Sequence, residues 1–315
     1  MDRAAFYTVA DARYFLGAVG LINSLRLVGH DEPIHVLDIG LTERQRELLD
    51  AEVNLIEGPA EIPGNLLKGI APRRHPASSM VLADADVIVT RRLADLIDSA
   101  ADGNALAFGT GMERSMPQWG ELLGGDVRPT PYLCSALVFC GGSLGDEIVR
   151  VLDDHAGDVD WELTYWRQNV DEYPYVHADQ DLMNAALSTR ADPTRVTELD
   201  GRLLASPPFA GLRVEDERTL RCAYADGSEP LGIHHWNAKP WLERTHHGVY
   251  SRLLRRLLVG PDVAIRVPDD QIPLRLRTGP FAWAERTAVN ARERLRWHVA
   301  APLAARARRA RGAAP

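Results

Sequence analysis

Lysine is almost missing from this chain of 315 residues. Of its 36 basic residues, only Lys68 and Lys239 are lysine, and the others are arginine. A general preference for arginine explains most of this bias, but it does not explain why two positions keep a compact ammonium group. An ammonium is a point-charge phosphate binder that a planar guanidinium does not replace. Lys68 and Lys239 are therefore candidate phosphate-binding residues.

The chain also has no long apolar run, no secretory leader pattern and few cysteines. No apolar stretch approaches the roughly 20 residues that a membrane-spanning helix needs, and residues 1–3 lead directly into a strand-like segment without a signal-peptide pattern. The three cysteines, Cys134, Cys140 and Cys222, are odd in number and lack the spacing of a metal site. We therefore expect a protein of the reducing cytoplasm.

Negative and positive charges are unevenly distributed along the chain. Residues 281–315 contain eight arginines and two glutamates, a net of +6, which leaves −14 on the rest of a chain whose net charge is −8. The acidic body argues against nucleic acid as a partner. The basic tail, which also contains Trp297, Val299 and Leu303, predicts either a helix lying on an anionic membrane or a solvated end. The first alternative implies peripheral contact with the inner face of the membrane.

Strand-like and helix-like patterns alternate through the first half of the chain. Thr42 is positioned to cap the helix that begins with Glu43. Strands are expected at 5–10, 34–39, 53–56, 80–89, 105–109 and 132–140, and helices at 14–28, from 42 and at 181–187; residues 111–131 read as a long loop. This rhythm predicts an α/β fold with a largely parallel sheet. We expect one domain over 1–260, followed by a Pro-rich segment and basic helix over 261–315.

Two carboxylates interrupt one of these strands, which is otherwise apolar. Residues 80–90 read MVLADADVIVT, so that Asp84 and Asp86 flank Ala85 within a stretch typical of a buried strand. Burying two like charges close together is costly unless a positive group lies between them, and the simplest such group is a divalent cation. A strand end that turns polar as it reaches solvent is the alternative interpretation. Because ligands gather at the carboxyl ends of parallel strands, Asp11 is expected at the same edge.

Two further segments combine residues that carry chemistry. Residues 232–241 read GIHHWNAKPW and join two imidazoles to Lys239; a neutral imidazole suits Mn²⁺, whereas a surface loop of packed His and Trp is the alternative. Asp179, Gln180 and Asp181, with Asn184 three residues beyond, form the second segment. Asp179 is also placed to serve as a helix N-cap, and the two roles are compatible.

The order of these residues resembles a known family. Asp11 and Tyr14 come first, followed by Lys68, Asp84-Ala85-Asp86, Tyr132 with Ser135, Asp179-Gln180 and a histidine leading to Lys239-Pro240-Trp241. This series is similar to the family 8 retaining glycosyltransferases of GT-A fold, the group of glycogenin and the bacterial lipooligosaccharide galactosyltransferases, over residues 5–258. The resemblance implies a metal-dependent hexosyltransferase that uses a nucleotide sugar, with UDP as the expected nucleotide and an acceptor that the motifs do not identify.

The resemblance also implies a role for each motif residue. Asp84 and Asp86 would coordinate Mn²⁺ or Mg²⁺ with His235 as the third ligand and His234 as the competing choice. Lys239 would hold the leaving β-phosphate, and Lys68 the phosphate or the sugar. The other expected donor contacts are Asp11 and Tyr14 at the base or ribose, Ala85 and Ser135 at the donor, Asp179 at the sugar hydroxyls, and Gln180 near the anomeric carbon. Catalysis would rest on Asp179, Gln180 and Lys239, through front-face attack or a side-chain nucleophile.

This chain departs from the family pattern at three places. His235 and Lys239 are only four residues apart, two fewer than is usual in the family. Cys134-Ser135-Ala136 replaces an Asn-Ser-Gly, and Arg13 replaces an uncharged polar residue. The first two departures would suit a degenerate protein that binds a nucleotide sugar without turnover. A haloacid-dehalogenase-type phosphatase, with Lys239 and Asp269-Asp270 completing the site, is the other rival enzyme.

Overall fold

The computed structural model describes residues 2–235, 239–243 and 248–295. Its main sheet has the order β3-β2-β1-β4-β7-β6-β8, and β7 runs antiparallel to both of its neighbours, whereas the other pairs are parallel. The strands of this sheet are β1 (Asp2–Ala10), β2 (Ile34–Asp38), β3 (Asn54–Glu57), β4 (Ala77–Ala83), β6 (Ala105–Gly109), β7 (Leu133–Gly141) and β8 (Val196–Leu199). The predicted α/β fold with a mostly parallel sheet is confirmed.

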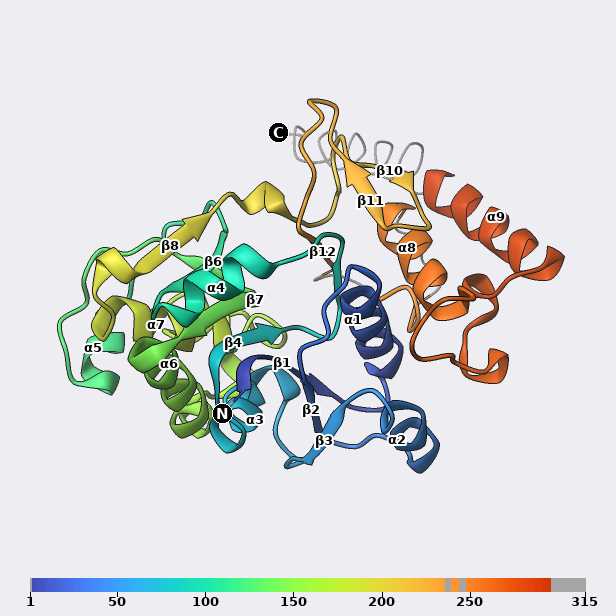
Figure 1. Cartoon of the computed structure of the whole chain (residues 1–315). Helices are drawn as coiled ribbons and strands as arrows, with labels where there is room; N and C mark the ends of the chain where they lie inside the picture. The colour runs from blue at the N-terminus through green and yellow to red at the C-terminus, as the bar shows by residue number, and fades with distance from the viewer. Residues whose placement is uncertain (1, 236–238, 244–247, 296–315) are drawn as a thin grey trace, which may run out of the picture.

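Helices cover both faces of this sheet (Figure 1). Their bounds are α1 (Phe15–Leu27), α2 (Glu43–Leu49), α3 (Ile70–Arg74), α4 (Ala94–Ala101), α5 (Gln118–Leu123), α6 (Gly142–Asp154), α7 (Asp179–Thr189), α8 (Gly248–Val259) and α9 (Pro280–Leu295). Alternate residues of β4 belong to different core clusters: Val81 packs with α1, α4 and α8, and Leu82 with α3, α6 and α7. The period of two along a strand thus gives the sheet two buried faces.

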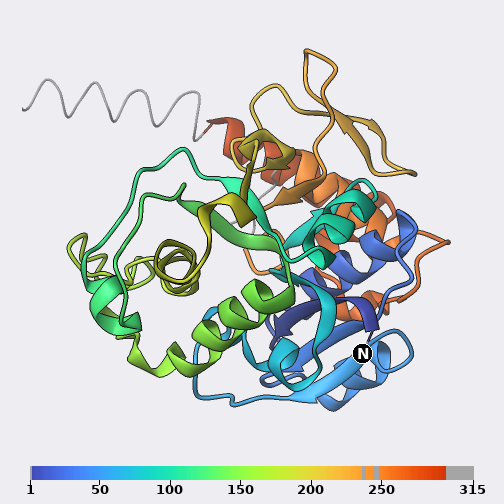
Figure 2. The ribbon, with the colours of Figure 1, turned by 60° about the vertical axis from the view of Figure 1, so that its left-hand side comes forward.

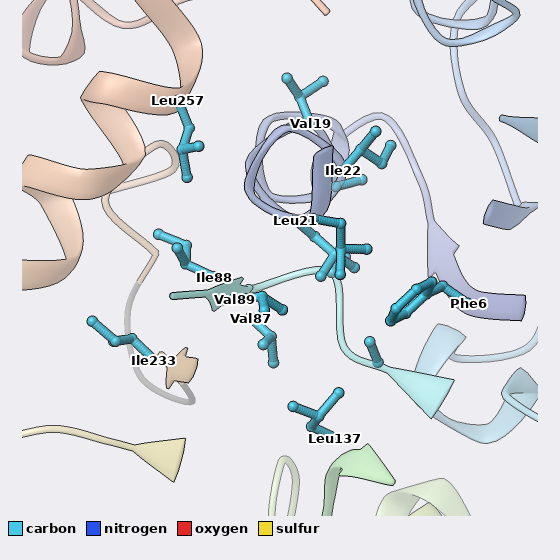
Figure 3. Packing of buried hydrophobic residues seen from close by; sticks show 14 of the residues in the cluster. Phe6, Val19, Leu21, Ile22, Val87, Ile88, Val89, Leu137, Ile233 and Leu257 are labelled. Atoms are coloured by element: carbon cyan, nitrogen blue, oxygen red, sulfur yellow. The ribbon is translucent and has the colours of Figure 1, made fainter. Parts of the chain in front are cut away.

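Two smaller sheets adjoin the main one. The first has the order β5-β12-β9 and consists of β5 (Val87–Val89), β12 (Gly232–His234) and β9 (Leu204–Ala205). The second is the hairpin of β10 (Arg213–Asp216) and β11 (Arg221–Ala223), which projects from the body of the molecule in both views (Figures 1 and 2). Figure 3 shows the apolar side chains of β5 beneath α1, with Ile233 of β12 and Leu257 of α8 beside them.

The expected single strand over 80–89 is wrong. β4 ends at Ala83 and β5 begins at Val87, and the two strands belong to different sheets. The intervening turn is closed by a hydrogen bond from the Val87 amide to the Asp84 carbonyl (3.0 Å). Both strands are buried, so the run looks continuous in sequence although the backbone turns between them.

Other local expectations have mixed outcomes. Thr42 caps α2 as predicted, in a reciprocal pair with Gln45. Asp179 is not an N-cap: α7 begins with Asp179 itself, and the capping position belongs to Ala178, whose φ is 52°. The expected loop over 111–131 contains α5, whose Trp119 is fully buried and donates to the Pro174 carbonyl (2.8 Å).

The Pro-rich segment after residue 260 packs against α1. Asn23 is buried in α1, and its amide nitrogen donates to the carbonyls of Leu257 (2.8 Å) and Ile265 (2.9 Å). Its carbonyl oxygen accepts from the Ile265 amide (2.8 Å). Ile272 and Leu276 join the same apolar cluster as α1. The division at residue 260 stays a prediction.

No helix of the described part is long and apolar enough to cross a bilayer.

Replacing Asn23 by alanine should lower the free energy of unfolding by about 2–4 kcal/mol, because it leaves the buried Ile265 amide and two carbonyls unpaired. Urea unfolding measures the change. Asn54→Ala is the matched control: Asn54 is exposed at the start of β3, so its loss should stay within about 0.5 kcal/mol. Equal losses for the two variants would show that Asn23 does not tie the segment to α1.

Candidate metal and diphosphate site

The predicted site residues meet at one edge of the main sheet. Asp11 follows β1 and Asp84 follows β4, which are parallel neighbours, so both lie at the carboxyl edge of the sheet. Ser135 lies near the start of β7, which is antiparallel to β4 and therefore begins at this edge. Asp179 and Gln180 form the first turn of α7. Residues far apart in the sequence thus converge here.

Lys68 joins three of these residues on one side of the site. Its Nζ lies 2.5 Å from Asp84 Oδ1 and 2.7 Å from Asp179 Oδ2, and it donates to the Ser135 carbonyl (3.0 Å). Burial by itself lowers the pKa of Lys68, but the carboxylates of Asp179 and Asp84 outweigh this penalty and hold the pKa well above its ordinary value. Lys68 therefore stays charged although its side chain is only 8% exposed.

Asp86, Lys239 and His234 form the other side. The ammonium of Lys239 donates to Asp86 Oδ2 and to the backbone carbonyl of His235. His234 Nε2 lies 3.4 Å from Asp86 Oδ1 and 3.8 Å from Asp84 Oδ2. Burial opposes ionisation of Asp86, but Lys239 and His234 hold its pKa below the ordinary range. Burial raises the pKa of Asp84, and the nearby Asp86 charge adds to this increase against the effect of Lys68.

Asp84, Asp86 and His234 can together hold a metal ion. Each offers one ligand atom, and these atoms lie within 4.8 Å of one another. Asp86 Oδ1 is buried and faces His234 Nε2 at 3.4 Å without a well-formed hydrogen bond, so a cation between these two atoms could bind both. Two carboxylates and one imidazole suit Mn²⁺ and also allow Mg²⁺.

The alternation of side chains along β12 places His234, and not His235, beside the carboxylates. Successive side chains of a strand point to opposite faces. Ile233 is fully buried in the apolar cluster around α1, so His234 points away from this core, toward Asp86. The ring of His235 lies 5.0 Å from that of Tyr250 and 6.0 Å from that of Phe209. Sequence reasoning preferred His235, because nothing local to residues 232–235 shows which face of the strand is buried.

The first helix places Tyr14 beside Lys239. One oxygen of Asp11 accepts from the amides of Arg13 (2.9 Å) and Tyr14 (2.8 Å), and so fixes the entry to α1. The Tyr14 ring centroid lies 5.8 Å from Lys239 Nζ. Trp241 packs edge-on against Tyr14 and donates to the Arg13 carbonyl (2.7 Å). The Pro-Trp after Lys239 thus anchors this loop to α1.

Close approach of α1 to the aspartate turn requires a glycine. A Cβ at Gly17 would lie 2.6 Å from the Ala85 carbonyl oxygen and 2.8 Å from the Trp241 ring. Sequence reasoning missed both this residue and Tyr250, whose hydroxyl donates to the Asp86 carbonyl (2.9 Å). Neither has a local signal, because each acts through a contact distant in sequence.

A buried polar network supports Asp179, Gln180 and Ser135. Asp181 is fully buried and accepts from Arg114 Nε (2.9 Å), Tyr132 Oη (2.7 Å) and the His177 amide (2.7 Å). Asn184 pairs with both backbone groups of Leu133 at 2.8 Å. These contacts fix α7 against β7. Ser135 then donates to Asp179 Oδ2 (2.6 Å) and, through its amide, to Gln180 Oε1 (3.3 Å).

Comparisons with known proteins support the fold. No family model matches the chain, and no curated protein matches its sequence. The solved structures that resemble it include the galactosyltransferase LgtC in complex with donor and acceptor sugar analogs, with a TM-score of 0.52, 18% identity and coverage of 84% of this chain and 98% of that one. A Gln-to-Glu active-site mutant of LgtC matches with a TM-score of 0.54, 17% identity and the same coverage.

A third similar structure is the apo form of the bifunctional glycosyltransferase WbbM. It matches with a TM-score of 0.53 and 16% identity, over 82% of this chain and 50% of the other. The chain therefore has the GT-A fold of these glycosyltransferases. The resemblance read from the motifs is confirmed at the level of the fold.

The charge on His234 should make the metal-free protein lose stability at high pH. Burial lowers its pKa, but the Asp86 carboxylate outweighs burial and raises the pKa from 6.5 to about 10. Because the folded-state value is the higher one, this contribution is fully present below about pH 6.5 and is lost as the pH rises through about 10. Urea unfolding with chelator between these values should show a steeper loss for the wild type than for His234→Gln. Equal slopes would contradict the raised pKa.

Proposed function

We propose that this chain is a metal-dependent glycosyltransferase of the family 8 type that transfers a hexose from a nucleotide sugar, with UDP as the nucleotide. One observation carries the proposal. Asp84, Asp86 and His234 form a cluster with metal-ligand spacing, flanked by both lysines of the chain, at the carboxyl edge of a GT-A sheet. This arrangement suits a diphosphate bound through a cation.

Asp84, Asp86 and His234 would hold Mn²⁺ or Mg²⁺, and His235 is assigned a packing role instead. When bound, the metal supplies positive charge to the two phosphates of the donor. Lys68 and Lys239 already lie against the same carboxylates. A diphosphate at this position therefore comes within reach of both ammonium groups, and Lys239 would hold the β-phosphate as it leaves. One well-placed group of this kind lowers a barrier by about 3–4 kcal/mol.

The remaining donor contacts follow the order of residues along the site. Tyr14 would stack on the base, and Asp11 would contact the base or ribose. Ala85 and Ser135 would lie along the donor. Asp179 would bind the sugar hydroxyls, and Gln180 would lie near the anomeric carbon. In support of this order, Tyr14 is next to Lys239, whereas Asp179 and Gln180 contact Ser135 on the far side of the carboxylates.

Transfer with retention would follow from front-face attack. The acceptor hydroxyl oxygen forms a bond to the anomeric carbon while the bond from that carbon to the β-phosphate oxygen breaks. The bonding electrons leave with the diphosphate, which also takes the hydroxyl proton. Asp179 is a poor nucleophile here, because Lys68 (2.7 Å) and Ser135 (2.6 Å) both bind its Oδ2. Gln180 carries an amide, so its role is to position the reacting groups.

The two rivals fit the structure less well. In the phosphatase hypothesis, Asp269 and Asp270 would face Asp84; instead Asp270 pairs with Arg44 of α2 (2.7 Å). The degenerate binder rests on the short spacing from His235 to Lys239 and on Cys134-Ser135-Ala136, in which Ser135 still contacts Asp179 and Gln180. However, Lys239 reaches Asp86 despite that spacing.

Incubation with a panel of nucleotide sugars tests the function directly. We expect Mn²⁺-dependent hydrolysis of at least one UDP-sugar, lost with chelator and reduced at least about 100-fold in Asp86→Asn. His234→Ala should raise the Mn²⁺ concentration needed for half-maximal rate about 10- to 100-fold. His235→Phe, which keeps an aromatic ring against Tyr250, is the matched control and should leave that concentration unchanged.

Two results would contradict the proposal. A thermal shift with UDP and Mn²⁺ but no turnover would favour the degenerate binder. Turnover that survives chelator and the Asp86 variant would remove the metal assignment.

We also propose that the chain works in the cytoplasm as a peripheral protein on the inner face of the membrane. In α9, Phe281 is 79% exposed and Trp283 is 63% exposed, and aromatic residues of this kind favour the membrane interface. Residues 296–315 of the basic tail lie outside the described residues. They contain Trp297, Val299, Leu303 and most of the arginines of the tail. An anionic surface would suit its charge, at about 1 kcal/mol for each basic residue near the lipid.

Cosedimentation with vesicles tests this placement. Binding should require an anionic lipid, weaken as salt is added, and fall at least about tenfold when residues 281–315 are deleted. Vesicles of neutral lipid are the control. Undiminished binding by the truncated protein would sink the membrane assignment.

A further inference from the structure

A platform of exposed aromatic rings lies on the segment that precedes Asp179 and Gln180. We call Tyr165 and Trp166 the aromatic platform; each is 49% exposed. Their rings meet edge to face at 5.8 Å, and Trp161 stacks on Trp166 at 5.4 Å with an interplanar angle of 12°. Large exposed aromatic surfaces are costly in water and mark interaction sites.

The backbone holds the platform in place. Thr164 is fully buried, and its hydroxyl donates to the Trp161 carbonyl (2.7 Å). The Tyr165 amide donates to the Val176 carbonyl (2.7 Å), and the Asn169 amide donates to the Thr164 carbonyl (2.9 Å). The rings are thus presented on an ordered frame. A ligand that binds them does not have to organise the segment first.

His177 connects the platform to the proposed catalytic residues. Its ring lies 6.1 Å from that of Tyr165. Its carbonyl accepts from the Gln180 amide (3.1 Å), and its own amide donates to Asp181 (2.7 Å). The platform is therefore one side chain away from the turn that carries Asp179 and Gln180. A molecule stacked on it can extend toward the donor sugar.

The charge around the platform restricts what can bind. Residues 156–178 contain five acidic residues and one arginine. This negative field opposes phosphates, nucleic acid and anionic lipid. Exposed polar groups of Glu162, Arg167 and Gln168 lie in the same segment. Aromatic faces beside polar groups suit a ligand with an apolar C–H face and a rim of hydroxyls, and an uncharged pyranose has this combination.

We propose that the aromatic platform binds a pyranose ring of an uncharged oligosaccharide acceptor. The acceptor role, although not the binding itself, rests on the function proposed above. The C–H face of the sugar packs on the electron-rich ring faces of Tyr165 and Trp166. Because the platform is separated from Gln180 by His177, the stacked ring is not the one that reacts. The acceptor therefore contains more than one sugar.

A glycan array probed with the full-length protein, Mn²⁺ and UDP tests this binding. The array carries short neutral oligosaccharides beside sialylated and sulfated ones. Wild-type protein should bind neutral glycans in preference to anionic ones. Truncation of either platform ring, in Tyr165→Ala or Trp166→Ala, should weaken this binding about tenfold or more. Trp166→Phe keeps a ring face and should retain part of the binding. Thermal unfolding confirms that each variant is folded.

Trp283→Ala is the matched control, because it removes an exposed tryptophan from a basic region instead. It should weaken vesicle binding and leave glycan binding intact, whereas Trp166→Ala should do the reverse. The platform assignment is overturned if no neutral glycan binds, if anionic glycans are preferred, or if the platform variants bind as the wild type does. Hydrolysis of UDP-sugars by the wild type separately tests the proposed function. Its absence beside platform-dependent glycan binding would overturn that function alone.

Discussion

The close approach of a buried carboxylate, Asp86, to the partly buried Asp84 is the constraint on which this structure depends. Asp84 and Asp86 leave the end of β4 on a turn covered by α1 and Tyr250, so their charges cannot be screened by water alone. Lys68 compensates the first and Lys239 with His234 the second. Each compensating group comes from a different part of the chain. Lys68 follows the 3₁₀ helix Gly64–Leu67, His234 ends β12, and Lys239 precedes α8. The three positive groups thus come from separate elements that meet at the two aspartates.

This constraint gives the lysine content a physical meaning. Both lysines of the chain are buried; Lys68 contacts Asp84, and Lys239 contacts Asp86. A planar guanidinium is larger and presents its donors in a rigid fork. It would not fit beside Asp84 and Asp179 as a single ammonium does. Apart from these two lysines, all of the Lys/Arg positions of the chain are arginine. The chain thus keeps lysine where a compact charge is needed.

Exposed aromatic rings occur in two regions of opposite charge. The platform lies on a segment with five acidic residues and one arginine, whereas the exposed rings of α9 precede an arginine-rich tail. Similar apolar surface is therefore proposed to meet different partners, because nearby charge affects which ligands approach. The acidic segment leads directly into the turn that carries Asp179 and Gln180. The exposed rings of α9 lie on a helix held by Arg286, which donates to the carbonyls of Arg275 and Arg277.

The sequence by itself determined the α/β class, the capped start of α2, and the set of chemistry-bearing residues at the sheet edge, because strand and helix periods and local capping act over short distances. It did not determine that residues 80–89 form two strands, since both halves are equally apolar. Tertiary structure also placed His234, and not His235, beside the two carboxylates. The pairing of β12 with β5 turns Ile233 into the core, and the alternation of the strand then directs His234 to the carboxylates. Such a choice depends on which face of a strand is buried, and only the packed fold supplies that.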